Sequence, residues 1–117
     1  SSVPQDLVDI INQYGGKIPE TYGVPVEEIQ EGIRNGVRKI NVDTDNRLAI
    51  TGAIRKVLHE NPSAFDPRDY MKPARAAMKE VVKARMIAFG QAGQGDKVPR
   101  QSLEDMKRRY HDMNPAG

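Results

Sequence analysis

The sequence predicts an α/β protein, because one short strand stands between helical stretches in the first half of the chain. The strand covers residues 37–42 and carries three β-branched side chains: Val37, Ile40 and Val42. A cluster of small polar residues follows it, and a helical pattern begins directly afterwards. A helix–strand–helix order with polar residues at the end of the strand is typical of the closing part of a parallel α/β fold.

Two helices are predicted before this strand. Ser2 and Gln5 have the spacing of a capping box, and apolar residues then recur at helical spacing until Gly15-Gly16. Pro25 begins a second short helix, which Asn35-Gly36 ends. Because the chain opens at a helix cap, we expect the natural sequence to continue upstream.

Helices also dominate the rest of the chain. A helix over residues 43–58 follows the strand, with its cap in the polar cluster. Asp66 and Pro67 begin a long helix, as N-cap and first helical residue, and this helix reaches Phe89 with a kink or restart at Pro73.

The last part of the chain is predicted to be a linker followed by one more helix. Residues 91–100 contain glycines, glutamines and a proline, which predicts a mobile linker. Ser102 with Asp105 then caps the last helix.

A lone strand cannot pair its own N–H and C=O groups. Its partners must therefore come from another polypeptide or from further strands of a larger protein. We favour the larger protein.

Composition excludes several classes of function. The 117 residues are enough for one domain, and the 38% of hydrophobic residues argues against disorder. Cysteine is absent, which excludes disulfides, a thiol nucleophile and a zinc–thiolate site. A net charge of +2 with 5% aromatic residues does not indicate nucleic-acid binding. No apolar run is long enough for a membrane span and no signal peptide is visible, so we expect a cytoplasmic protein.

The candidate functional residues lie at the end of the strand and in the long helix. Asn41, Asp43 and Thr44 suit an anion site at a helix N-terminus, and they suit an ordinary N-cap equally well. Arg68 by itself is more consistent with a solvated side chain than with a phosphate clamp. His59 and His111 are too far apart in sequence to predict a metal site within this chain.

Several motifs together resemble one enzyme family. They occur in this order: Ser1-Ser2-Val3-Pro4, Thr21-Tyr22-Gly23-Val24-Pro25, Gly36-Val37-Arg38-Lys39-Ile40-Asn41-Val42-Asp43-Thr44-Asp45 and Phe65-Asp66-Pro67-Arg68. They resemble the C-terminal third of a class II (zinc-dependent) fructose-1,6-bisphosphate aldolase of the Calvin-cycle and bacterial type. The resemblance implies the end of a TIM (β/α)8 barrel over residues 1–60, with its last strand and flanking helices, and a C-terminal helical extension over residues 61–117.

The resemblance also implies which residues bind substrate. Ser1 matches a serine that holds the triose 1-phosphate, and Asn41 matches an asparagine that contacts the dihydroxyacetone part. Val42, Asp43 and Thr44 match the rest of that binding segment. Arg68 matches an arginine that reaches a neighbouring subunit and binds the 6-phosphate, which implies a homodimer or larger homo-oligomer.

No catalytic or metal-ligating residue is expected in this chain. The family's zinc ligands and its general acid/base lie upstream of residue 1, and the resemblance leaves room for a monovalent cation. The implied reaction is the reversible cleavage of fructose 1,6-bisphosphate to dihydroxyacetone phosphate and glyceraldehyde 3-phosphate. A tagatose-bisphosphate aldolase of the same family and a non-catalytic helical interaction module are the alternatives.

Overall fold

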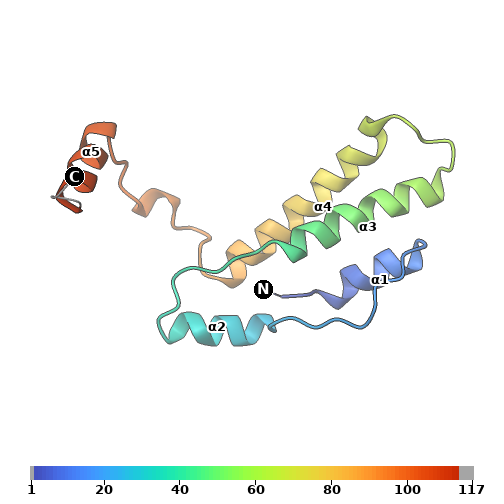
Figure 1. Cartoon of the computed structure of the whole chain (residues 1–117), viewed down its shortest axis with the longest axis horizontal. Helices are drawn as coiled ribbons and strands as arrows, with labels where there is room; N and C mark the ends of the chain where they lie inside the picture. Colours follow the sequence, from blue (N-terminus) through green and yellow to red (C-terminus); the bar gives the residue numbers. More distant parts are fainter. Residues whose placement is uncertain (1, 114–117) are drawn as a thin grey trace.

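The computed structural model describes residues 2–113, and every regular element among them is helical (Figure 1). No strand or sheet is present in this range. The α-helices are joined by irregular segments, and one short 3-10 helix precedes the last of them. The elements are α1 (Gln5–Gln13), α2 (Val26–Arg34), α3 (Thr44–Glu60), α4 (Pro67–Ala88), η1 (Gly95–Lys97) and α5 (Leu103–Met113).

The predicted α/β class, and with it the barrel segment and its strand, was therefore wrong for this structure. Residues 37–43 connect α2 to α3 without regular secondary structure. The physical reason is the lack of a pairing partner: a strand exists through hydrogen bonds to a neighbour, and within residues 2–113 no second strand pairs with this segment. β-Branched side chains favour extended backbone but cannot replace those bonds.

The centre of the molecule is a hairpin of α3 and α4, and α1 packs against α3 (Figure 1). Fully buried apolar side chains come from all three helices: Val8, Ile11, Ala49 and Ala74. Gly52 lies where α1 meets α3, and a Cβ atom there would come within 3.2 Å of the Ile10 Cγ2 atom. Small residues on the inner face of α3 thus allow close approach of the helices.

Most predicted helix ends were confirmed. Gly15 and Gly90 follow α1 and α4 with φ of +88° and +78°, which glycine adopts without steric cost. The Asp66 carboxylate caps α4 by accepting from the Arg68 backbone N–H at 2.9 Å. Pro73 does not interrupt α4, so a restart there is wrong. Ser102 and Asp105 bond reciprocally at the start of α5, as predicted.

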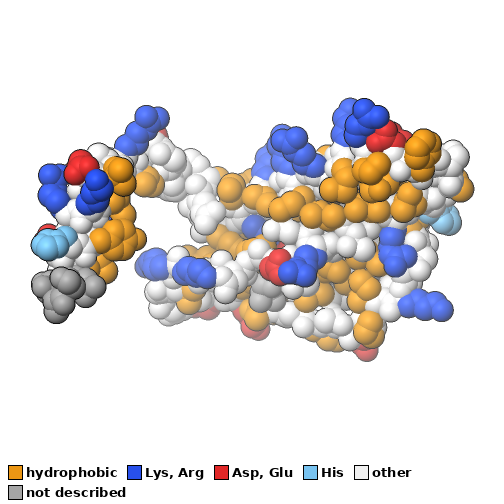
Figure 2. Space-filling model, turned by 45° about the horizontal axis from the view of Figure 1, so that its top comes forward, with side chains coloured by type: hydrophobic (Ala, Val, Ile, Leu, Met, Phe, Trp, Pro, Cys, Tyr) orange, Lys and Arg blue, Asp and Glu red, His pale blue; other side chains and the backbone are white. Residues whose placement is uncertain are grey.

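The last helix, α5, stands apart from the other helices, beyond the segment that contains η1 (Figure 1). The radius of gyration is 19.4 Å, compared with about 13 Å for a compact domain of about 100 residues. Hydrophobic side chains lie open over the α3–α4 hairpin and along α5 (Figure 2). Among them Leu103, Tyr110 and Met113 are 64–71% exposed. None of the described helices is long and apolar enough to cross a membrane.

Candidate functional site

The predicted substrate segment leads into the N-terminus of α3. Asn41 and Asp43 are exposed, whereas Val42 and Thr44 are half-buried. Asp43 is the N-cap residue of α3, although its side chain makes no capping hydrogen bond. The first backbone N–H groups of a helix have no acceptor within the helix, so this end of α3 can offer donors to an anion. Ser1, the other residue predicted to bind this phosphate, lies outside the described residues.

Cationic side chains flank this segment. Arg47, in the first turn of α3, donates from Nε to the Asp43 carboxylate at 2.8 Å. Lys39 donates from Nζ to the amide oxygen of Asn41. Both positive charges lie beside the residues predicted to bind an anion, which favours anion binding at this end of the helix.

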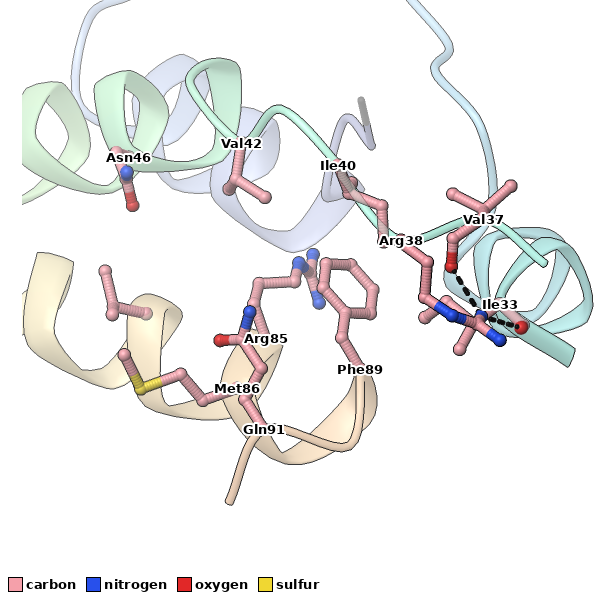
Figure 3. Close-up of a pocket in the computed structure, with 11 residues that line it drawn as sticks. Ile33, Val37, Arg38, Ile40, Val42, Asn46, Arg85, Met86, Phe89 and Gln91 are labelled. Atoms are coloured by element: carbon pink, nitrogen blue, oxygen red, sulfur yellow. Dashed lines mark hydrogen bonds between the residues drawn. The ribbon is translucent and has the colours of Figure 1, made fainter. Parts of the chain in front are cut away.

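The segment before α3 runs between two hollows of the surface. Four of its side chains, Val37, Arg38, Ile40 and Val42, line a cavity of about 350 Å³ against the last turns of α4. Lys39 and Asn41 line a second hollow of about 330 Å³ against α2, and Val37 and Ile40 line both cavities. Figure 3 shows Arg85 of α4 and Phe89, the residue directly after α4, facing Ile40 and Arg38 across the larger cavity. Asn41 thus lines the hollow against α2 and does not line the larger cavity.

Arg68, the predicted clamp for the second phosphate, lies in the first turn of α4. Its side chain is 90% exposed and pairs with Asp66, with the Nη2 atom 2.5 Å and the Nε atom 3.0 Å from Oδ2. Hydrogen bonds from the side chain and then the backbone N–H of Arg68 lower the pKa of Asp66, and the pair raises the pKa of Arg68. The guanidinium is therefore oriented and charged at the molecular surface.

The structure does not bring Arg68 to the substrate segment. Arg68 is at the start of α4, beside the C-terminal end of α3, whereas Asn41–Thr44 lie at the N-terminal end of α3 (Figure 1). The 17 residues of α3 separate the two positions by about 25 Å at 1.5 Å per residue. One chain therefore cannot place both on the same small molecule.

The Asp66–Arg68 pair predicts a pH-dependent start of α4. In the folded chain the pKa of Asp66 lies below its ordinary value of 3.8. The pair therefore stabilises the folded chain in full above pH 3.8, and this stabilisation is lost as the pH falls through the lowered pKa. We expect NMR titration of the Asp66 carboxyl to give a midpoint below 3.8, with faster exchange of first-turn amides below it. Asp66→Asn keeps a capping residue and should remove this pH dependence. A midpoint above 3.8 would contradict the pairing.

Sequence reasoning missed the most deeply buried polar group among the described residues. Asp45, in the first turn of α3, is 0% exposed. Its Oδ2 atom accepts from the Ser2 hydroxyl at 2.6 Å and from Arg85 Nε at 2.8 Å, with Arg85 Nη2 at 2.7 Å. Ser2 was predicted to cap the first helix, but Pro4 holds that position without a side-chain bond. Helical spacing could have indicated that Asp45 is buried, because it shares one face of α3 with Ala49 and Gly52.

No metal site forms within the described residues. Residues 2–113 contain no group of three His, Asp or Glu side chains that could hold a metal ion. His59 packs against Tyr14, with ring centroids 5.3 Å apart and ring planes tilted by 59°. This part of the chain therefore does not fit a bound zinc ion, and no chemical step is assigned to a metal here.

Comparison with known proteins identifies the family. The family model described as fructose-bisphosphate aldolase class-II matches residues 20–94. The chain belongs to this family. Fructose-bisphosphate aldolases from a Nostoc species and from Pseudomonas aeruginosa are 57% and 61% identical to it over 110 residues, and fructose-bisphosphate aldolase class 2 of Synechocystis is 54% identical. The alignments cover 94% of this chain and 31% of each relative.

The class II aldolase match includes most of the candidate residues. Asn41–Thr44, Asp45, Arg68 and Arg85 all lie within residues 20–94, whereas Ser2 and α5 lie outside them. The predicted family is thus confirmed, and it favours an aldolase over a non-catalytic helical interaction module. The roles predicted for individual residues were not tested by these comparisons.

Proposed function

We propose that this chain is the substrate-binding part of a class II fructose-bisphosphate aldolase. The full-length enzyme would cleave fructose 1,6-bisphosphate reversibly to dihydroxyacetone phosphate and glyceraldehyde 3-phosphate. The observation that carries the proposal is the 54–61% identity to proteins named as fructose-bisphosphate aldolases over nearly the whole chain. Those names also favour fructose bisphosphate over tagatose bisphosphate as the substrate. Assaying the enzyme with each bisphosphate tests this choice.

In this proposal the segment before α3 binds the ketose phosphate. Asn41 would donate and accept hydrogen bonds at the dihydroxyacetone part, because an amide carries both functions. Ser1, Val42, Asp43 and Thr44 would hold the 1-phosphate through hydroxyls and backbone N–H groups. The exposed position of Asn41 and the helix N-terminus at Thr44 support this role.

Arg68 would bind the 6-phosphate in the site of a second subunit. A guanidinium suits phosphate because two N–H groups can donate in parallel. The support is its 90% exposure together with the length of α3 between it and Thr44. The functional assembly would then be a homodimer or larger, with each site formed by two chains.

The two parts of the chain would divide this work. Residues 1–60 would bind the ketose phosphate, and the helical extension over residues 61–117 would place Arg68 in the site of the second subunit. The exposed hydrophobic side chains of α4 and α5 support packing against the rest of the enzyme. The enzyme would act in the cytoplasm with zinc as its cofactor. Zinc polarises a ketone oxygen when bound, and its ligands would lie outside the described residues.

The proposal predicts that the 117 residues alone are inactive. We expect no retro-aldol turnover from the isolated chain with added zinc, because residues 2–113 hold no metal site. The full-length enzyme, assayed under the same conditions by following glyceraldehyde 3-phosphate, should be active. Turnover by the isolated chain would contradict the proposal that this chain supplies substrate binding only. An inactive full-length enzyme would overturn the proposed function.

A further inference from the structure

One carboxylate oxygen joins three distant segments of the chain. Asp45 Oδ2, at the start of α3, accepts a hydrogen bond from Ser2, 43 positions earlier, and another from Arg85, 40 positions later. Ser2 is 6% exposed and the Arg85 side chain is 17% exposed. The guanidinium approaches the same oxygen through both Nε and Nη2. The buried charge of Asp45 is therefore compensated by an opposite charge, as a buried carboxylate requires.

Two members of this network are sequence neighbours of predicted phosphate ligands. Ser2 directly follows Ser1, and Asp45 directly follows Thr44. We propose that the Ser2–Asp45–Arg85 network positions the start of α3 at Thr44, a predicted ligand of the 1-phosphate of the ketose. This inference rests on the proposed function. Asp45 and Ser2 are positioning residues, because they act through their neighbours without touching the substrate.

The network acts through the backbone, because an anchored residue limits the movement of the residue next to it in the chain. Thr44 and Asp45 are consecutive in the first turn of α3, with Cα atoms about 3.8 Å apart, so anchoring Asp45 limits how far Thr44 can shift. The Ser2 hydroxyl fixes the N-terminal segment to α3, and Arg85 fixes α3 to the last turns of α4. A binding group displaced by about 1 Å loses much of its contribution. We therefore expect that removing one of these hydrogen bonds weakens the binding of this phosphate.

Ser2→Ala and Asp45→Asn in the full-length enzyme test this role. In the condensation direction, KM for dihydroxyacetone phosphate should rise on the order of tenfold, while KM for glyceraldehyde 3-phosphate should change by less than about twofold. Matched controls are Ser63→Ala and Asp9→Asn, whose side chains are exposed and outside the network. Both controls should leave the two KM values unchanged.

The outcomes are distinguishable. A purely structural role would lower the active fraction, and thus kcat, without separating the two KM values. Unchanged or equally raised KM values in Ser2→Ala would overturn the positioning role. If Asp45→Asn does not fold, Ser2→Ala still carries the test, because it removes only one hydroxyl. Wild-type enzyme that cannot condense the two trioses would instead overturn the proposed function itself.

Discussion

Replacing Arg68 with alanine in the full-length enzyme is expected to raise KM for fructose 1,6-bisphosphate on the order of 10- to 100-fold. KM for dihydroxyacetone phosphate should change by less than about twofold, because that triose carries only the phosphate bound near Thr44. Steady-state kinetics in both directions measures the difference. Arg109→Ala, which removes an exposed arginine in α5, is the matched control. Equal effects on both substrates would contradict the assignment of Arg68 to the 6-phosphate.

Mixed dimers can show whether Arg68 acts across subunits. A heterodimer of Asn41→Ala and Arg68→Ala chains would contain one site with both defects and one with neither. If Arg68 serves the second subunit, the mixed dimer regains about half of the wild-type activity. If Arg68 serves its own chain, every site carries a defect and activity stays low. The length of α3 between the two residues favours the first result.

Replacing Ile11 with alanine is expected to destabilise the isolated chain by about 2–5 kcal/mol. Ile11 is 2% exposed and is one of the largest fully buried side chains among the described residues. It packs where α1 crosses α3 beside Gly52. Because so few apolar side chains are fully buried, this loss should release α1 from α3. Urea denaturation followed by far-ultraviolet circular dichroism measures the change.

The control for this prediction is Ile87→Ala. Ile87 is 60% exposed in α4, so the same change of residue type removes little buried surface there. We expect an effect within about 0.5 kcal/mol, since alanine also has the higher helix propensity. Similar destabilisation at both positions would show that Ile11 does not belong to the core.

Helix positions could be predicted from the sequence because their signals are local. Pro67 after Asp66, Gly90 after Phe89, and the Ser102–Asp105 pair each act within one turn of a helix. Residues 37–42 could not be placed in the same way. Their β-branched side chains indicate extended backbone, but whether a strand forms depends on a partner that local sequence does not reveal.

The candidate site shows the same limit. The motif from Asn41 to Thr44 and the Asp-Pro-Arg run were recognisable because their residues are adjacent. The bonds of Asp45 with Ser2 and Arg85 were not, because each spans 40 or more positions. The roughly 25 Å between Arg68 and Thr44 emerged only once α3 and α4 were seen to form a hairpin.

The hairpin also sets an order of assembly. Six residues connect α3 to α4, whereas thirty residues separate α1 from α3. If both connections are treated as flexible chains before α2 forms, closing the longer one costs about 1.4 kcal/mol more in chain entropy. The hairpin can therefore form first during refolding, and α1 docks onto a surface that already exists. The Ser2–Asp45 bond joins the segment before α1 to the start of α3, so it forms only where α1 has docked.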